Sequence, residues 1–404
     1  MSVPIKPPSV TPLSTILPSE PLLLMGAGPV PIPQAVANAN GVVINHLGET
    51  MDTVISAVKR MAAYAFQTTS DKILGVGGPS SAAMEMAVSN LCWPGRRVLC
   101  LSSGTFSARL GEMARGVGAE VTELRSEGPA PVRLAQVEEA FAKQDFDVVT
   151  MVQGETSCGV WTADLPAIVK LARERGALTV VDAVVTLTTM PLNTDEWGVD
   201  VAITGGQKGL SSIPGVSLCA FSERAWEVVE SHPTPRPHWC LDATRAQKFW
   251  GHQQYHYTAP VPGILALHEA LRMIAEETLE RRFWRHERSS LAMQSGIEAM
   301  GLSLFTPQEH RLNSVIAIDL PEGIDGGAVR KHMRDSFHVE ISGAFGLNII
   351  RVGQMGEQCR SHNLFKTLYA MGISFKREGV DLDVASGMAA LEQGLAEDAE
   401  HFVD

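Results

Sequence analysis

The sequence predicts an α/β protein with two domains: a large domain built on a doubly wound, mostly parallel sheet, and a smaller C-terminal α+β domain. The chain has 404 residues, more than the roughly 250–300 at which one hydrophobic core stops growing. From residue 26 to about 275, short β-branched apolar runs alternate with amphipathic helical stretches. This alternation is typical of a sheet that carries helices on both faces.

Five apolar segments are the best strand candidates of the large domain. They span residues 98–101, 148–152, 178–181, 201–204 and 216–221. Between them, residues 165–175 place apolar side chains at helical spacing, as a crossover helix between parallel strands requires. We therefore expect residues 26–275 to form the large domain.

The remaining sequence predicts a smaller domain over residues 276–404. A helical pattern from about Pro262 to Met300, rich in Leu, Ala, Glu and Arg, could bridge the two domains. Two strand patterns and a final helix follow, near residues 314–319, 348–352 and 384–396. A mixture of this kind is typical of a small α+β unit.

Composition excludes several classes of partner and of site. The formal net charge of -12 at pH 7 would repel a phosphate backbone, so nucleic acid is not an expected partner. The 6 cysteines lie far apart and form no C-x-x-C pair, which argues against a disulfide framework and against a metal site. No apolar stretch reaches the ~18 residues that a membrane span needs, so no membrane partner is expected.

The first 25 residues are rich in proline and contain one basic residue, Lys6. They match neither a secretory signal peptide nor an arginine-rich transit peptide. We expect residues 1–25 to be an extended arm on a soluble, cytoplasmic protein.

Two residues near the ends of neighbouring strand candidates carry the strongest functional signal. Asp182 directly follows the strand 178–181, and Lys208 follows the strand 201–204 in a turn with the sequence Gly-Gly-Gln-Lys. Ligands bind at the carboxyl ends of strands in open α/β sheets. A lysine there can form a Schiff base, and a buried carboxylate can keep a pyridine nitrogen protonated, as pyridoxal 5'-phosphate (PLP) chemistry requires.

Each of these residues has an ordinary explanation when taken alone. Asp182 could cap a helix at a strand-to-helix junction, and Lys208 could be a solvated surface charge. The pair, in this order and with these glycines, is far more specific than either member.

Several motifs in one order show that the chain resembles the class V aminotransferases, in the alanine/serine:glyoxylate branch. The motifs are Gly26-Ala27-Gly28-Pro29-Val30-Pro31, Gly154-Glu155-Thr156-Ser157-Cys158-Gly159, Tyr255-His256-Tyr257-Thr258-Ala259-Pro260 and Arg351-Val352-Gly353-Gln354-Met355-Gly356. The resemblance implies a fold-type I PLP-dependent transferase that works as a homodimer with shared active sites. It also implies a ping-pong transfer of the amino group of alanine or serine to glyoxylate or pyruvate.

The resemblance assigns five residues to the PLP ring. In the family, the counterpart of Lys208 binds PLP and relays a proton, that of Asp182 meets the pyridine nitrogen, and that of Val184 packs under the ring. Phe106 falls where an aromatic side chain stacks on the pyridine, and Ser157 aligns with a hydroxyl near the ring. Taken alone, Phe106 could be an ordinary core residue.

The phosphate of PLP is expected at the glycine-rich turn that precedes residue 80. The resemblance places Ser80, Ser81 and Gln207 on it, at a helix N-terminus whose N–H groups and dipole favour an anion. Tyr255 and Thr258 reach the phosphate from the other subunit, so the active site would require the dimer.

Three residues are expected beside the substrate. Arg351 aligns with the arginine that holds the substrate carboxylate, a role that the planar guanidinium suits through paired hydrogen bonds. Gly28 and His46 align with loops close to the substrate. As isolated residues, Arg351 could form a structural ion pair and His46 could be a structural loop residue.

Two departures from the family pattern concern the phosphate site. Many relatives have Ser or Thr where Gly206 stands, so one hydroxyl group is missing. The glycine-rich turn also has Pro79-Ser80-Ser81 in place of the commoner Ser-Gly-His.

Other functions stay open from the sequence. Ureidoglycine:glyoxylate aminotransferases use Gln and Asn where this chain has His46 and Tyr255, and pyridoxamine:pyruvate aminotransferases have an acidic residue where Pro79 stands. A PLP lyase of the cysteine desulfurase type usually has His before its lysine, whereas Gln207 precedes Lys208 here. A binding protein that kept only the fold would not need this lysine together with its aspartate.

Overall fold

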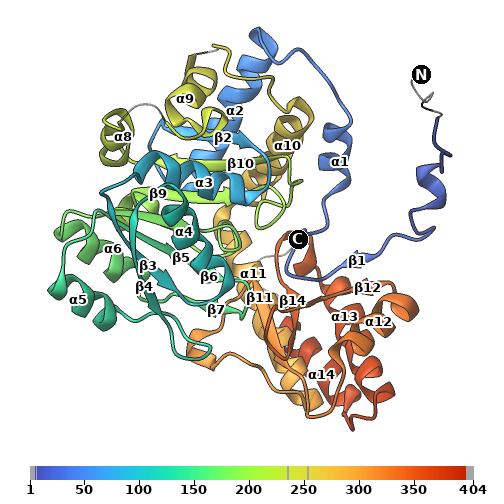
Figure 1. Cartoon of the computed structure of the whole chain (residues 1–404). Helices are drawn as coiled ribbons and strands as arrows, with labels where there is room; N and C mark the ends of the chain where they lie inside the picture. The colour runs from blue at the N-terminus through green and yellow to red at the C-terminus, as the bar shows by residue number, and fades with distance from the viewer. Residues whose placement is uncertain (1–4, 6, 234–235, 253, 397–404) are drawn as a thin grey trace.

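The structure is a computed structural model that describes residues 5, 7–233, 236–252 and 254–396. Its large sheet has the strand order β2-β10-β9-β8-β5-β3-β4, and helices lie on both faces (Figure 1). The strands are β2 (Ile73–Gly77), β3 (Arg97–Ser102), β4 (Glu120–Arg125), β5 (Val148–Val152), β8 (Leu178–Asp182), β9 (Val201–Gly205) and β10 (Val216–Phe221). Every residue of β5, β8 and β9 is buried, as expected of central strands that are covered on both faces.

Most neighbouring strands of this sheet are parallel. β3 is parallel to β4 and β5, and the parallel pairs β5–β8 and β8–β9 continue the sheet. β10 is antiparallel to both of its neighbours, β2 and β9. The predicted mostly parallel sheet is confirmed, and the five predicted strands correspond to β3, β5, β8, β9 and β10.

Ten α-helices of the described chain belong to this part of the sequence. They are α1 (Gln34–Asn40), α2 (Glu49–Phe66), α3 (Ser80–Leu91), α4 (Thr105–Gly116), α5 (Leu134–Lys143), α6 (Leu165–Glu174), α7 (Thr194–Trp197), α8 (Glu223–Glu230), α9 (Ala243–His252) and α10 (Val261–Glu277). In α6, the predicted crossover helix, Leu165, Ile168, Val169 and Ala172 recur at helical spacing and are all buried. A short hairpin of β6 (Gly154–Glu155) and β7 (Val160–Trp161) follows β5.

The helical pattern predicted from Pro262 to Met300 is divided into two helices. α10 ends at Glu277, and α11 spans Leu279–Met300. Thr278 lies between them with a φ of 68°, a conformation that interrupts the helix and that a β-branched residue rarely adopts. Its hydroxyl instead caps α11 by accepting a hydrogen bond from the Arg281 amide.

The C-terminal part of the chain has its own sheet and hydrophobic cluster. β11 (Val315–Asp319), β14 (Ile349–Gly353) and β13 (Ser342–Gly343) form an antiparallel sheet in that order. The helices are α12 (Gly326–Phe337), α13 (Ser361–Arg377) and α14 (Val384–Ala396). β1 (Leu23–Leu24) pairs in parallel with β12 (Val339–Glu340), and Met25 belongs to this second cluster. β1 and Met25 thus pack with the C-terminal part of the chain. The predicted domain boundaries at residues 25 and 275 stay predictions.

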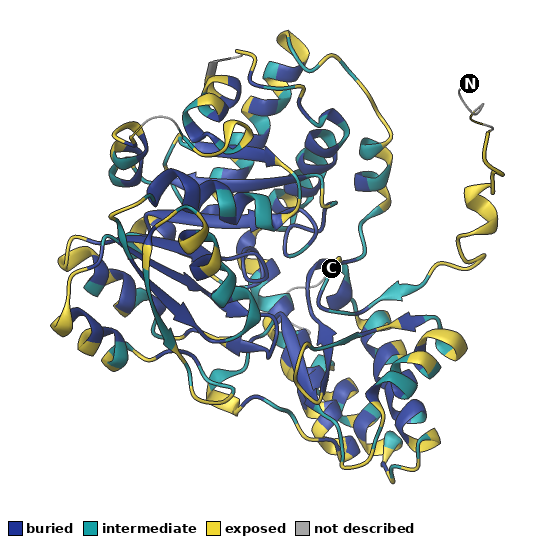
Figure 2. Ribbon diagram, viewed as in Figure 1, coloured by how far each residue is buried: buried dark blue, intermediate teal, exposed yellow. Residues whose placement is uncertain are grey.

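The described part of the predicted arm extends away from the rest of the chain (Figure 1). It contains the short 3-10 helix η1 (Leu13–Thr15), and Figure 2 shows it exposed as far as β1. Among the residues that the structure describes, we find no helix with the length and apolar character needed to cross a membrane.

Candidate active site

The carboxyl ends of β8 and β9 bring Asp182 and Lys208 into one cavity. Asp182 is the last residue of β8, and Lys208 lies in the turn that follows β9. Both line a cavity of about 320 Å³, which lies within the ~300–1,000 Å³ of small-molecule sites. The other predicted site residues that line it are Gly28, Ser80, Ser81, Phe106, Val184 and Gln207.

Burial shifts both titratable groups toward their neutral forms. Desolvation raises the pKa of Asp182 to about 7, although its Oδ1 accepts a hydrogen bond from the Val184 amide at 2.8 Å. Desolvation, followed by the positive charge of Arg351, lowers the pKa of Lys208 to about 8. Two groups with shifted pKa values in one cavity are typical of a functional site.

The side chain of Lys208 lies against the glycine turn of the first motif. Its Nζ donates a hydrogen bond to the carbonyl oxygen of Ala27. Gly28 has a φ of 103°, which favours glycine, and a Cβ atom there would collide with the Lys208 side chain. The backbone approach to the lysine therefore requires glycine at this position.

A polar end of the cavity is formed by the start of α3. Ser80 is the first residue of this helix, and no side chain caps its N-terminus. Gln207 Nε2 donates to Ser80 Oγ at 2.9 Å, so the Ser80 oxygen acts as the acceptor in this bond and its hydroxyl proton can be donated to another group. Ser81 adds a second hydroxyl to the lining. A helix N-terminus with two hydroxyl groups is suited to an anion.

Steric crowding explains why glycine, and not serine or threonine, stands at position 206. A Cβ atom on Gly206 would collide with the carbonyl oxygen of Ile213, and the Ser212 amide donates to the Gly206 carbonyl at 2.7 Å. The loop that follows Lys208 thus fills the space that a serine side chain would need. Ser80 and Ser81 are the serine hydroxyl groups that line the cavity in this chain.

Phe106 and Val184 supply apolar walls, and Phe106 is fixed by a buried glutamate. The Glu155 carboxylate accepts hydrogen bonds from the amides of Phe106 at 3.2 Å and Ser107 at 2.9 Å. It also accepts from the hydroxyls of Ser107 at 2.8 Å and Ser157 at 2.5 Å. Glu155 therefore provides acceptors for the first amide groups of α4 and orients Phe106. From the sequence, Glu155 was known only as a member of a motif.

Three neighbouring residues differ from the sequence-based expectation. Thr156 lines the cavity with Lys208, whereas Ser157 lines an adjacent one and its hydroxyl is engaged by Glu155. Arg109 also lines the cavity, with its guanidinium carbon 4.7 Å from the centre of the Phe106 ring. Its position one helical turn after Phe106 was the only sequence signal for it.

Arg351 lies on β14 and uses its guanidinium to join two parts of the chain. Nη1 donates to the Thr156 carbonyl at 2.7 Å, Nε donates to the Gly343 carbonyl at 2.9 Å, and Nη2 also donates to Gly343. Each terminal nitrogen has a second N–H bond beyond these contacts. Arg351 is buried and does not line the described cavity, so its role at the substrate stays a prediction.

His46, Tyr255 and Thr258 are close together but do not line this cavity. His46 Nδ1 accepts a hydrogen bond from the Ala259 amide at 3.2 Å, and its ring meets that of Tyr255 edge-on at 5.8 Å. Tyr255 and Thr258 are exposed. Residues that are expected to reach another subunit must be exposed in the single chain. His46 lies beside these residues.

Comparisons with known proteins give a consistent set of similarities. A family model described as Aminotransferase class-V matches residues 34–377. An alanine–glyoxylate aminotransferase of Mus musculus is 30% identical over 358 residues, which cover 86% of each chain. The crystal structure of a ureidoglycine–glyoxylate aminotransferase from Bacillus subtilis matches with a TM-score of 0.91 and 29% identity, over 94% of this chain and 100% of the other. A pyridoxamine–pyruvate aminotransferase from Mesorhizobium loti has a TM-score of 0.89 and 25% identity, over 94% and 98%.

Proposed function

The chain belongs to the class V aminotransferase family, and we propose that it uses PLP to move the amino group of alanine or serine to glyoxylate or pyruvate. Family membership makes it an aminotransferase. The observation that carries the proposed cofactor is the pair of Asp182 and Lys208, which line one cavity and have pKa values moved to about 7 and about 8.

The residues of the cavity fit PLP at each of its functional groups. Lys208 offers a desolvated amine, Asp182 a buried carboxylate, and Ser80 a free hydroxyl proton at a helix N-terminus. When bound, PLP supplies an electron sink for the substrate Cα atom. Phe106 and Val184 would hold its ring between apolar surfaces.

Lys208 would hold the cofactor through Nζ and would move the proton at the substrate Cα. Its pKa of about 8 leaves a larger neutral fraction near neutral pH than an exposed lysine has. Asp182 would hold the positive charge of a pyridine nitrogen, because an opposite charge at short range favours the ionised carboxylate. The hydrogen bond from the Val184 amide keeps that carboxylate oriented.

Arg351 would bind the carboxylate of both substrates in turn. Its two remaining N–H bonds could pair with a carboxylate, and its backbone contacts to Thr156 and Gly343 would hold the guanidinium in place. Gly28 and His46 would limit the space for the substrate side chain. Because Tyr255 and His46 lie together on the surface, His46 would act in the neighbouring subunit's site.

The homodimer is part of this proposal. Ser80, Ser81 and Gln207 would bind the phosphate from one subunit, and Tyr255 and Thr258 would complete the site from the other. Exposure of both latter side chains in the single chain supports this arrangement.

A PLP lyase of the cysteine desulfurase type is the least supported alternative. Such an enzyme needs a reactive cysteine near the substrate. Burial raises the pKa of Cys158 to about 12, and it raises the pKa of Cys359, so neither thiol favours the nucleophilic thiolate. Both are buried.

The ureidoglycine:glyoxylate reaction is the stronger alternative, supported by the structural match to the Bacillus subtilis enzyme. A donor panel of alanine, serine, ureidoglycine and pyridoxamine, each tested with glyoxylate and with pyruvate, distinguishes the candidates. We expect alanine or serine with glyoxylate or pyruvate to give the highest kcat/KM. A higher value for ureidoglycine or pyridoxamine would replace the proposed donor and leave the transaminase class intact.

A further inference from the structure

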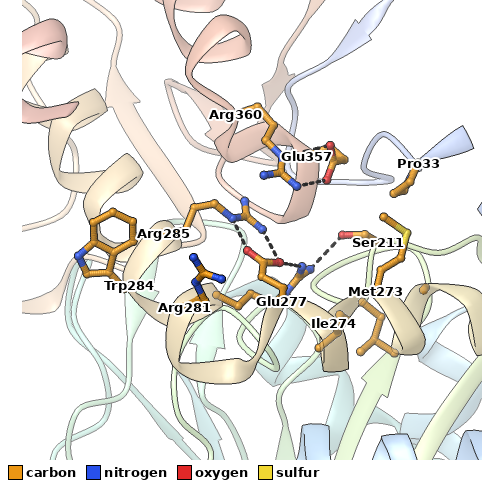
Figure 3. Close-up of a pocket in the computed structure, with 13 residues that line it drawn as sticks. Pro33, Ser211, Met273, Ile274, Glu277, Arg281, Trp284, Arg285, Glu357 and Arg360 are labelled. Carbon is orange, nitrogen blue, oxygen red and sulfur yellow. Dashed lines mark hydrogen bonds and ion pairs between the residues drawn. The ribbon is translucent and has the colours of Figure 1, made fainter. Parts of the chain in front are cut away.

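A second cavity, of about 280 Å³, lies beside the loop that follows Lys208 (Figure 3). We call residues 206–212 the lysine loop. Figure 3 shows Glu277 at the centre of the cavity wall, with ion pairs to Arg285 and to a second guanidinium group that also reaches Ser211. This second group belongs to Arg282, near the start of α11.

Arg282 is buried, and all three of its guanidinium nitrogens are engaged. Nη1 donates to Glu277 at 2.8 Å, and Nε donates to the Thr188 hydroxyl at 3.1 Å. Nη2 donates to the Gly209 carbonyl at 2.9 Å and to the Ser211 hydroxyl at 3.2 Å. Internal partners therefore occupy this arginine, and the cluster is built to hold protein segments together.

These contacts join the two segments that carry the predicted catalytic pair. Thr188 belongs to the segment that follows Asp182, whereas Gly209 and Ser211 follow Lys208. The Thr188 hydroxyl also donates to the Gly209 carbonyl at 2.7 Å. One guanidinium group therefore fixes the continuation of β8 against the continuation of β9.

Both hydroxyl partners of Arg282 have unusual backbone conformations. Thr188 has a φ of 70° and Ser211 a φ of 57°, in the left-handed region that non-glycine residues seldom occupy. Such conformations persist only where the surroundings enforce them, and they cluster at functional sites. The hydrogen bonds from Arg282 are well placed to enforce both.

The same cluster reaches the strand that carries Arg351. The 3-10 helix η4 (Gly356–Cys359) follows β14, and the Gly356 carbonyl accepts from Arg285 Nη1 at 2.8 Å. Gly356 has a φ of 58°, and a Cβ atom there would collide with the Ser211 hydroxyl. The lysine loop thus packs directly on the segment that continues from β14.

We propose that Arg282 is a positioning residue that holds Lys208 in the active site by fixing the lysine loop to Thr188. The proposal rests on the proposed function, because it presumes that Lys208 is the working amine. A displacement of about 1 Å at a reacting group costs on the order of 100-fold in rate. The buried guanidinium group of Arg282 donates both to Thr188 and to the lysine loop, so it is suited to prevent such a displacement.

Hydrogen exchange of the PLP-free full-length protein tests this role without depending on activity. The reporters are the amides of Gly209, Ser211 and Ser212, which donate to Val184, Lys208 and Gly206. Arg282→Lys keeps the positive charge but removes the planar guanidinium group and its several donors. We expect these amides to exchange about tenfold faster in this variant, because local opening requires less free energy.

Arg311→Lys is the matched control. Arg311 likewise has all three guanidinium nitrogens engaged, with Thr306, Gln294 and Glu298, and within the described part of the chain none of these partners belongs to the lysine loop. We expect its exchange in residues 206–212 to equal that of the parent. Equal exchange in Arg282→Lys and the parent, or equal acceleration in both variants, would overturn the proposal.

The PLP-loaded protein gives a second readout. Arg282→Lys should lower kcat about 10- to 100-fold with a smaller change in KM, and shift the pH midpoint of the PLP absorption band. If Arg282→Lys does not fold, Thr188→Val removes the shared hydroxyl and should accelerate the same amides. If the parent protein binds no PLP at Lys208, the proposed function fails, while the exchange data still decide whether Arg282 fixes the loop.

Discussion

The amino group of Lys208 donates a hydrogen bond to the backbone carbonyl of Ala27, in the glycine turn that follows β1. Lys208 lies in the turn after β9 and Ala27 in the first motif, so this contact joins the lysine turn to the N-terminal segment. Among the residues that the structure describes, this carbonyl oxygen accepts the hydrogen bond of Nζ, and burial removes much of the water around the amine. An amine with a lowered pKa is suited to the nucleophilic role proposed for Lys208.

Lys208→Ala should abolish both the visible absorption of bound PLP and turnover, because the variant lacks the amine that would hold the cofactor. Absorption spectra after PLP addition and desalting, with alanine:glyoxylate assays, measure this. Lys59→Ala is the control, because burial also lowers the pKa of Lys59, on α2, away from the cavity lining. The assignment is wrong if Lys208→Ala keeps both properties.

Asp182 and Lys208 should give the PLP-free protein opposite dependences of stability on pH. Folding raises the pKa of Asp182 from 3.8 to about 7, so the folded state binds the extra proton in this interval and stability falls as pH rises through it. Folding lowers the pKa of Lys208 from 10.5 to about 8, so the unfolded state binds the extra proton there and stability rises with pH.

Asp182→Asn should therefore stabilise the PLP-free protein at pH 8 by on the order of a few kcal/mol, and the gain should vanish toward pH 4. Urea denaturation at several pH values measures it. Asp195→Asn should have the opposite sign, because hydrogen bonds from Thr68 and Thr69 outweigh burial and lower the pKa of Asp195. A variant no more stable than its parent at pH 8 would contradict the prediction that burial destabilises the ionised Asp182 carboxylate.

The central strands of the large sheet, and the positions of Asp182 and Lys208 at their carboxyl ends, could be predicted because their signals are local, whereas β2 and β4 were not predicted. β5, β8 and β9 are largely apolar runs that are buried along their whole length; Asp182 is the last residue of β8, and Lys208 lies in the turn after β9. The break at Thr278 could not be predicted, because the apolar periodicity continues through it and only the backbone angle of 68° departs.

Roles that depend on distant contacts were not visible in the sequence. Glu155 orients Phe106 by accepting hydrogen bonds from amide groups that lie about 50 residues earlier in the chain. Arg351 donates to backbone carbonyl oxygens, which every residue carries, so no residue type marks its partners. His46 meets Tyr255 only after folding brings their two loops together.

The protein should be an obligate homodimer, with a sedimentation mass about twice the 43.5 kDa of the chain. The shared site allows a sharper test by mixing two inactive variants, Lys208→Ala and the double variant Tyr255→Phe, Thr258→Ala. Subunit exchange should restore roughly a quarter of the parent activity, because half of the dimers then hold one intact site. No recovery after proven exchange, or a fully active monomer, contradicts sites shared between subunits.

Replacing Arg351 should weaken both half-reactions, because one guanidinium group is expected to bind the carboxylates of the amino acid and of the 2-oxo acid. Arg351→Ala removes charge-assisted hydrogen bonds that contribute roughly 1.5–3 kcal/mol each, so kcat/KM should fall at least about tenfold for alanine and for glyoxylate alike. Single-turnover absorbance changes measure each half separately. Arg351 also joins Thr156 to Gly343, so thermal unfolding must accompany the kinetics, with Arg330→Ala as the control because the Arg330 guanidinium packs on the same Gly343. The single-carboxylate role of Arg351 is wrong if the change spares one half-reaction, or if glutamate or aspartate is a far better donor than alanine and serine.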